Sequence, residues 1–442
     1  MAKVRAFLLY QNPYFRLMNP KNLLYGALLG LILACNDDTS PTESQPLIEP
    51  LFACESGVAG PYACRGIDLM GHLSLEEMDA TAGNDCWGWT DPATGKEYAL
   101  MGLNNGTAFV DVTVANDPVY LGKLPTQTVS SVWRDIKVYR QYALIVADRA
   151  EDHGVQIFDL TRLRGVSAPT TFDADAHFDG LDSAHNIAVN EDSGYAYAVG
   201  ASTHSGGPHF INLIDPLMPQ DAGGYATSGY SHDGQVVTYN GPDSAYEGKE
   251  LFLGSNENEV VLVDVTDKDN PQLISRAQYT QTQYTHQGWL TEDHRFFLVG
   301  DELDELREGI PTRTLVFDIR DLDNPKVHFE YVAETDAIDH NGYVVGEEFY
   351  LASYTAGLRI LDISQIENKQ FTETAFFETH QEVPSGSGLI ETMAIQFDED
   401  HDNPLKGNNP LFDGAWSVYP YFDSGNIIVS DISGGLFVVR KQ

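Results

Sequence analysis

Four histidines recur along the chain at nearly constant intervals. They are separated by 47, 54 and 54 residues, and each opens a short strand-like stretch: His185, His232, His286 and His340. Imidazole is a ligand for Zn, Cu, Fe and Ni, and three or four imidazoles around one ion with an open position can activate water or dioxygen. A transition-metal site is therefore one of two interpretations of the pattern. The alternative is a structural role, in which each ring bonds to the backbone or to a neighbouring acid such as Asp233 or Asp339.

A run of acidic residues offers a second set of candidate ligands. Asp301, Glu302 and Asp304 follow a strand-like stretch, at a place where a loop should lie near the histidines. Carboxylates bind Ca²⁺ directly, and outer acids commonly orient metal-bound imidazoles. In so acidic a chain we expect a solvated loop by default, and the alternative is that these three residues bind a cation or support the histidines. Residues 398–403 also alternate acids, but they lack the glycine and glutamate of an EF-hand loop, which leaves only a looser calcium-binding insertion.

The absence of other motifs narrows the choice of function. The chain has no Walker loop, GxGxxG, GxSxG or HExxH motif, so nucleotide, dinucleotide, esterase and zincin chemistry have no local support. Two hypotheses remain. The leading one is a non-catalytic binding or scaffold protein, and the competing one is a metalloenzyme or metal-binding protein that uses the four histidines.

The histidines belong to a longer repeat that predicts the fold. Apolar runs that end in aspartate recur every 44 to 56 residues, at Asp111, Asp159, Asp215, Asp264, Asp318 and Asp362. A seventh copy at 435–439 has Arg440 in place of the aspartate. A second strand-like run precedes each copy, and a turn with a further short strand often follows. Four short strands per unit of this length are typical of a propeller blade, so we predict an all-β protein, a β-propeller of seven four-stranded blades.

The two ends of the repeat region predict how the ring closes. The last unit stops after its third strand, and residues 67–75 resemble a fourth-strand segment. This N-terminal strand should complete the last blade and remove two open sheet edges. Equivalent positions in a propeller converge on its axis, so the histidines should face one another at one mouth of the channel. Alignment of the other units adds Cys86, Arg134 and Trp416 to this ring.

The N-terminal segment has the features of an export signal. Its first 34 residues carry four basic and no acidic residues, and an apolar run too short for a membrane span leads to Cys35. The sequence of 32–35, Ile-Leu-Ala-Cys, resembles a bacterial lipobox, which predicts lipidation of Cys35 and an outer-membrane or cell-surface location. An ordinary secretory signal or an uncleaved anchor is the alternative, and translation could start at Met1 or at Met18. We therefore divide the chain into a signal (1–34), a lipidated cysteine with a flexible tether (35–51) and one propeller domain (52–442).

Charge and cysteines constrain the partners. The formal net charge of -39 argues against nucleic acid, because the chain would repel phosphates. In an oxidising compartment Cys54 and Cys64 should form a disulfide across a short loop, which leaves Cys86 unpaired. The expected partners are a membrane, reached through the lipid, and an extracellular protein or glycan. A loop-rich insertion near 368–412 would supply a surface for such a partner.

Several longer motifs carry a resemblance to a known family. They span nearly all of 52–440 and comprise residues 87–92, 95–100, 284–294, 301–305, 339–341, 357–362, 414–416 and 425–431. In these motifs the chain resembles the choice-of-anchor B family of LVIVD-repeat proteins. The resemblance implies a propeller outside the cytoplasm whose family members are fixed to the surface by different devices, here a lipid. It implies no established activity.

Overall fold

The computed structural model describes residues 48–381 and 411–442, which form one compact unit of almost entirely β structure. The predictions for the signal, for Cys35 and for the acidic stretch 398–403 lie outside these residues. Within the described part, the helices are too short or too polar to span a lipid bilayer.

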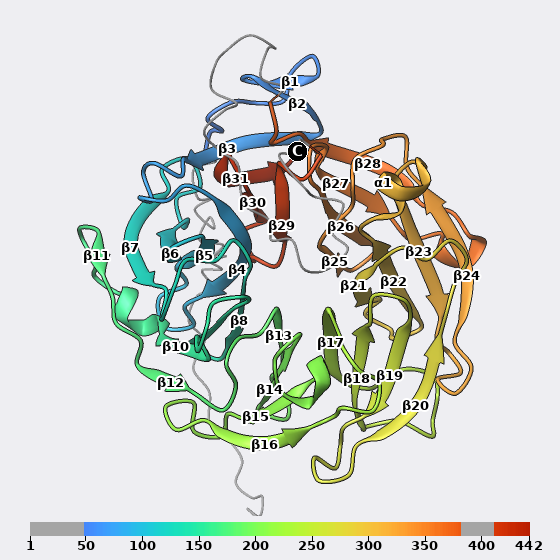
Figure 1. The fold of residues 1–442 in the computed structure, drawn as a ribbon. Coiled ribbons are helices and arrows are strands. Elements are labelled where there is room, and N and C mark those ends of the chain that lie inside the picture. The colour runs from blue at the N-terminus through green and yellow to red at the C-terminus, as the bar shows by residue number, and fades with distance from the viewer. Residues whose placement is uncertain (1–47, 382–410) are drawn as a thin grey trace, which may run out of the picture. The chain divides into compact units, whose positions relative to one another are not determined.

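Seven sheets, each containing four antiparallel strands, follow one another around a central axis (Figure 1). The first four, each given from the axis outward, are β4 (Gly83–Thr90), β5 (Glu97–Leu103), β6 (Gly106–Asp111) and β7 (Val119–Pro125); β8 (Arg134–Tyr139), β9 (Tyr142–Ala147), β10 (Val155–Asp159) and β12 (Ala176–Phe178); β13 (Asn186–Asn190), β14 (Tyr195–Val199), β15 (His209–Asn212) and β16 (Gln220–Gly224); β17 (Asp233–Thr238), β18 (Glu250–Ser255), β19 (Val260–Asp264) and β20 (Gln272–Ala277).

The last three blades follow the same order. They are β21 (Thr285–Leu290), β22 (Phe296–Asp301), β23 (Arg313–Asp318) and β24 (Lys326–Val332); β25 (Gly342–Val345), β26 (Glu348–Ser353), β27 (Gly357–Asp362) and β28 (Thr372–Phe377); β29 (Ala415–Tyr419), β30 (Asn426–Asp431), β31 (Gly435–Lys441) and β3 (Ile67–Leu73). The smaller elements are β1 (Val58–Ala59), β2 (Tyr62–Arg65), β11 (Thr170–Thr171), α1 (Asp304–Glu308) and three single-turn 3₁₀ segments, Leu160–Leu163, His204–Gly206 and Ile366–Asn368. The predicted seven-bladed propeller is confirmed.

The predicted closing strand is also present. β3 pairs antiparallel with β31, with Ile67 opposite Lys441 and Leu73 opposite Leu436. Cys54 and Cys64 form the expected disulfide, which links the segment before β1 to β2. β2 in turn pairs with β28 and so extends the sixth blade. The boundary predicted for the loop-rich insertion is wrong at its start, because residues 372–377 form β28; residues 382–410 lie outside the description.

The aspartates at the ends of third strands recur for a local structural reason. The aspartate carboxylate accepts a hydrogen bond from the backbone N–H two residues later, as Asp111 does from Thr113 and Asp264 from Thr266. Such Asx turns reverse the chain toward the fourth strand. In the third blade Asn212 takes this position, so the assignment of Asp215 to the repeat is wrong by three residues.

Polar side chains on the inner strands connect neighbouring blades. Asp135 Oδ2 accepts a hydrogen bond of 2.6 Å from Ile187 N, and Gln235 Oε1 accepts one of 2.9 Å from Leu290 N. Farther along the inner strands from the histidines, aromatic rings fill the axis. Trp289 and Trp87 both pack edge-on against Tyr343, at 4.8 and 5.7 Å between ring centroids.

Candidate metal and ligand site

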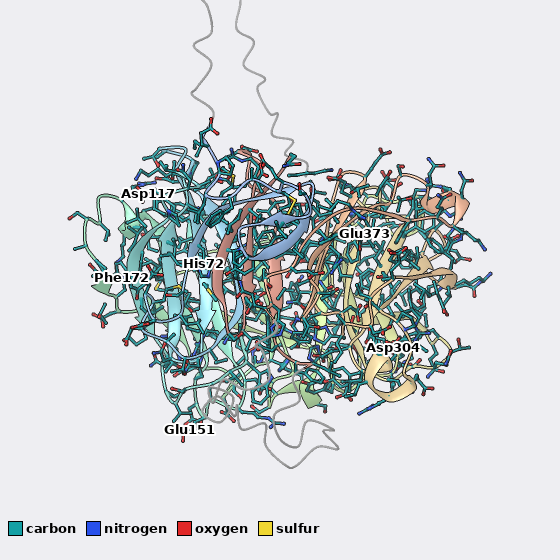
Figure 2. All side chains as sticks on the ribbon, turned by 90° about the horizontal axis from the view of Figure 1, so that it is seen from above. His72, Asp117, Glu151, Phe172, Asp304 and Glu373 are labelled. Atoms are coloured by element: carbon teal, nitrogen blue, oxygen red, sulfur yellow. A yellow bond between two sulfur atoms is a disulfide. The ribbon has the colours of Figure 1, made fainter. Side chains whose placement is uncertain are left out.

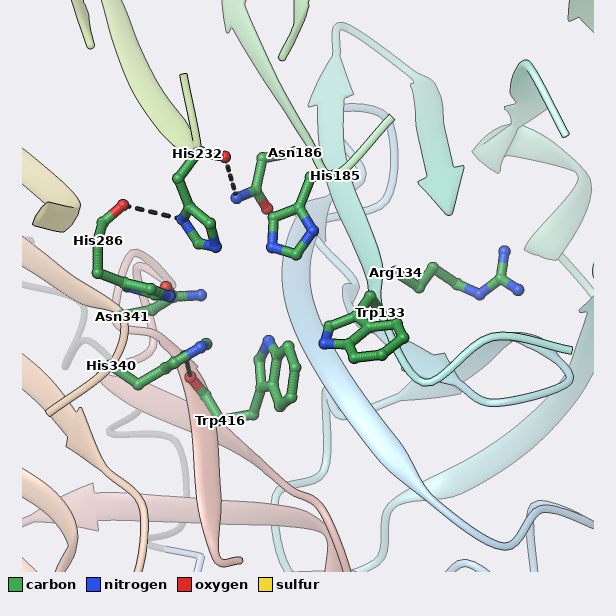
Figure 3. A pocket seen from close by; sticks show the side chains of 9 residues that line it. All are labelled: Trp133, Arg134, His185, Asn186, His232, His286, His340, Asn341 and Trp416. Carbon is green, nitrogen blue, oxygen red and sulfur yellow. Dashed lines mark hydrogen bonds between the residues drawn. The ribbon is translucent and has the colours of Figure 1, made fainter. Parts of the chain in front are cut away.

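The four predicted histidines lie next to one another at the axis. Each sits at or just before the start of the inner strand of its blade, and the centroids of successive rings are 4.2, 4.3 and 4.2 Å apart from His185 through His232 and His286 to His340 (Figure 3). Trp416 continues the series at 4.6 Å from His340. The repeat therefore brings these side chains together, while their role as ligands stays a prediction.

Backbone irregularities help to aim two members of this group. His286 and Trp416 each lie where the register between the first and second strands shifts by one residue. A β-bulge of this kind redirects a side chain without ending the strand, and bulges are common beside functional sites.

Hydrogen bonds fix how three of the imidazoles present their nitrogens. His232 Nδ1 lies 3.0 Å from the carbonyl oxygen of His286, and His340 Nδ1 lies 2.6 Å from that of Trp416. His185 Nδ1 lies 2.9 Å from Asp148 Oδ2. A nitrogen that faces a carbonyl or carboxylate must carry the proton, so in a neutral ring bound in this way Nε2 keeps its lone pair, as in metal-bound histidines. His286 Nδ1 is buried and has no hydrogen-bond partner.

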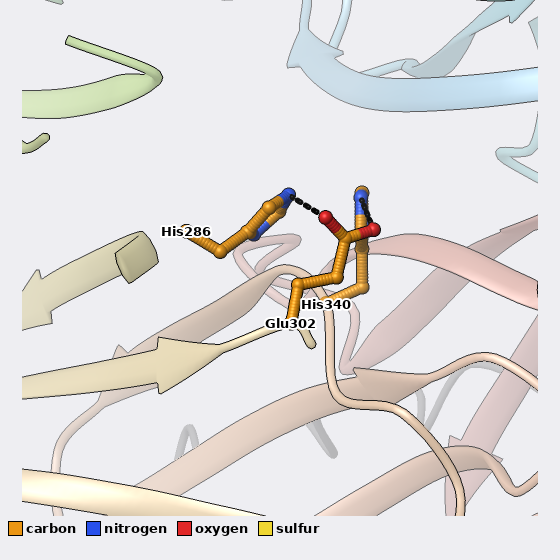
Figure 4. A group of neighbouring side chains, drawn as sticks. All are labelled: His286, Glu302 and His340. Carbon is orange, nitrogen blue, oxygen red and sulfur yellow. Dashed lines mark ion pairs between the residues drawn. The ribbon is translucent and has the colours of Figure 1, made fainter. Parts of the chain in front are cut away.

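Glu302 faces two of these nitrogens (Figure 4). Its Oε2 lies 3.7 Å from His286 Nε2, and its Oε1 lies 3.8 Å from His340 Nε2. The three residues offer one ligand atom each, all within 4.8 Å of one another. Two ligands that are each ~2.1 Å from one ion can be at most ~4.2 Å apart, so both measured pairs fit a shared ion with little movement. Tyr354 donates its hydroxyl hydrogen to Glu302 Oε1 at 2.9 Å and holds the carboxylate in place.

Burial controls the charge of the site. It lowers the pKa of His232 and His286 well below the ordinary value and that of His340 to about 3. At His185 burial acts the same way, but the hydrogen bond and charge of Asp148 outweigh it and raise the pKa. Burial also raises the pKa of Glu302 to about 7. Three of the four imidazoles are therefore neutral at neutral pH, which is the form that binds metals.

The histidines separate two cavities of very different size. The inner one, of about 10 Å³, lies between the four rings, Trp133 and Trp416, and this is about the space of one water molecule (Figure 3). The outer one measures about 920 Å³ and includes Glu302. Its lining includes three tyrosines, Tyr230, Tyr284 and Tyr354, and its volume suits a small organic ligand.

Two predicted members of the ring are wrong. Arg134 points away from the histidines, donates to the carbonyl of Leu103 and lies 3.1 Å from His153 Nε2, while Trp133 takes the place beside the axis (Figure 3). Cys86 is a free thiol buried in the core between blades.

The acidic run splits into residues with different surroundings. Glu302 faces the histidines directly, whereas Asp301 accepts hydrogen bonds from Tyr279 Oη, Gln283 N and Tyr284 N. Asp304 forms an ion pair with Arg313 at 2.7 Å.

A second repeated position also lines the site, and of its residues only Glu302 was predicted. The residue that follows the second strand of a blade reaches the outer cavity in five blades: Asp148, Gly200, Glu302, Tyr354 and Ile432. Their types differ, so no pattern of composition marked them, but their distance from the second strand is constant and could have identified them.

Comparisons with known proteins support the fold alone. No family model matches the chain, and no curated protein is similar to it in sequence. Among solved structures, hydrazine synthase from Kuenenia stuttgartiensis matches with a TM-score of 0.51 at 11% identity, over 78% of this chain and 92% of that one. The β-propeller domain of Cps50 (Swd1) from Myceliophteria thermophila matches with a TM-score of 0.48 at 9% identity, over 85% and 99%. Fold and site together define a seven-bladed β-propeller with a histidine-lined axial pocket.

Proposed function

We propose that this chain is an exported binding protein that uses a transition metal at the propeller axis to hold a small ligand. His286 and His340 bind the ion through Nε2, and Glu302 supplies the third ligand. The observation that carries the proposal is that one carboxylate faces two imidazole nitrogens, at 3.7 and 3.8 Å. A lipid on Cys35 attaches the protein to the outer membrane or cell surface.

The chemistry of the donors limits the choice of metal. Two neutral imidazoles and one carboxylate suit Zn²⁺ or Fe²⁺ better than Ca²⁺ or Mg²⁺, which prefer oxygen ligands only. Three protein ligands leave coordination positions open. The ion would lie beside the 920 Å³ cavity, from which a ligand could reach these positions.

The same donor set favours a second candidate function. Two histidines and one carboxylate with open positions form the ligand set of non-haem iron oxygenases. A metalloenzyme at the axis therefore remains the competing proposal, and iron rather than zinc in the purified protein would favour it.

Metal analysis of the purified protein tests both proposals. We expect close to one transition-metal ion per chain, lost in the double variant His286→Ala and His340→Ala. The control is His328→Ala, a partly buried histidine on β24 whose Nε2 lies 3.0 Å from the carbonyl of Ile366. The absence of transition metal after growth in metal-replete medium, or equal metal content in all variants, would refute a metal-dependent function.

A further inference from the structure

A second group of buried acids lies beside the axial site. Asp301, Asp304, Glu305 and Asp339 have 0, 0, 7 and 1% of their surface exposed. In the described part of the chain, Arg313 is the only basic side chain within 4.0 Å of any of them, and it pairs with Asp304 at 2.7 Å. Four carboxyl groups thus share one buried positive charge.

Five of the eight oxygens of these carboxyl groups lack hydrogen-bond partners. Asp304 Oδ1 and both oxygens of Glu305 and of Asp339 are buried without one. Asp301, in contrast, accepts three hydrogen bonds from a tyrosine hydroxyl and two backbone N–H groups. A buried, unpaired carboxylate is costly, and the usual remedies are a partner group, a bound metal or a proton.

The unpartnered oxygens come from two separate segments that meet at one place. Asp304 and Glu305 begin α1, which follows β22, whereas Asp339 lies in the connection between β24 and β25. The Asp339 carboxylate reaches the backbone of β22, since a Cβ atom at Gly300 would lie only 2.4 Å from its Oδ2. Glycine at this position makes room for the acid next to the turn that carries α1.

We infer that Asp304 Oδ1, Glu305 and Asp339 bind a divalent cation of the calcium class. All five free donor atoms are oxygens, and Ca²⁺ takes six to eight oxygen ligands, including water, in a flexible geometry. The donor atoms of the three residues do not all lie within 4.8 Å of one another, so the inferred ion requires these side chains to move closer together. Arg313 donates a hydrogen bond to Asp304 Oδ2, so Asp304 Oδ1 remains available to the ion.

The site is distinct from the transition-metal site, because none of its oxygen donors belongs to His286, Glu302 or His340. It lies on the turn that follows Glu302, so the cation would stiffen the segment that presents Glu302 to the histidines.

Calcium titration of the purified protein tests the inference. We expect 10 mM Ca²⁺ to raise the melting temperature by about 3 °C, given dissociation constants of ~10⁻⁴ to 10⁻³ M for extracellular modules. The isosteric double variant Glu305→Gln and Asp339→Asn should lose this shift. The control is Asp321→Asn and Asp323→Asn, which alters a second acidic trio with the half-buried Asp243 whose oxygens lie within 4.8 Å of one another; this variant should keep the shift, and its loss there would assign the calcium effect to that trio.

A second measurement covers the case in which the double variant fails to fold. Tb³⁺ bound to the unmodified protein should emit after excitation of tyrosine, because Tyr279 donates to Asp301 beside the site, and Ca²⁺ should displace it. No melting shift with Ca²⁺ and no displaceable Tb³⁺ emission would overturn the inference, as would an equal shift in the Glu305 and Asp339 variant. Transition-metal content is measured separately, so failure at one site is distinguishable from failure at the other.

Discussion

The Nδ1 atom of His340 donates its hydrogen to the backbone carbonyl of Trp416, 2.6 Å away, and this bond joins the sixth blade to the seventh. It also determines which nitrogen of His340 faces Glu302. The same contact therefore serves the assembly of the ring and the orientation of a proposed ligand, so the structural and metal-binding interpretations of the histidines are compatible.

The first prediction concerns Glu302. Replacement of Glu302 by Gln removes a charged ligand and should weaken transition-metal affinity at least ~10-fold, whereas Tyr354→Phe removes only the hydrogen bond to the carboxylate and should have a smaller effect. Competition with a chelator measures both. Unchanged affinity in the Glu302 variant would show that Glu302 is not a ligand and would assign the ion to the inner cavity among the four histidines.

The second prediction concerns pH. Burial, together with the charge of Arg134, lowers the pKa of His153 from 6.5 to about 4. The unfolded chain therefore binds a proton below pH 6.5 that the folded chain does not, so the free energy of unfolding should fall by about 3 kcal/mol from pH 7 to pH 4 through this group. In His153→Gln, whose amide oxygen can still accept from Arg134, that part of the fall should vanish. Urea unfolding across the pH range measures it, and identical slopes for both proteins would contradict the prediction.

The third prediction concerns a charge cluster at the inner strands. Lys137 Nζ lies 2.5 Å from Asp135 and 3.4 Å from Asp85, both buried. Lys137→Met should destabilise the fold by about 3 to 5 kcal/mol, because two carboxylates lose their cation. A second substitution, Asp85→Asn, should recover part of the loss. Chemical denaturation measures this coupling, and simple additivity of the two effects would exclude it.

The fourth prediction concerns the proposed lipid anchor. In a bacterial host, Cys35→Ser should abolish incorporation of labelled palmitate and release the protein from the membrane fraction, with Cys86→Ser as the control. Labelling that persists in the Cys35 variant would disprove the lipoprotein assignment.

The repeat made most of the fold predictable, because an aspartate turn ends the third strand in five of the seven blades. The histidines were found for the same reason, since His185, His232, His286 and His340 occupy equivalent places. The error at Arg134 has a physical cause. Successive side chains of a strand point to opposite faces, so an alignment wrong by one residue exchanged an outward arginine for Trp133 at the axis.

The roles of the individual acidic residues depend on tertiary structure and could not be predicted from the sequence. That Glu302 faces two histidines, whereas Asp301 is satisfied by neighbouring donors, depends on how the segment leaves β22. The shared surroundings of Asp304, Glu305 and Asp339 likewise appear only when the fifth and sixth blades meet. Figure 2 shows Asp304 and Glu151 at one face of the propeller and Asp117 at the opposite face. No sequence pattern separates these three acids.

The pairing of β3 with β31 has a consequence for biogenesis. Residues 67 and 441 become neighbours in one blade. β3, the first strand of the propeller to be synthesised, therefore cannot pair until β31 has been synthesised. Pairing across so long a stretch of chain is entropically demanding and slow. Chaperones that shield strand edges should therefore matter most for this protein before its final dozen residues emerge.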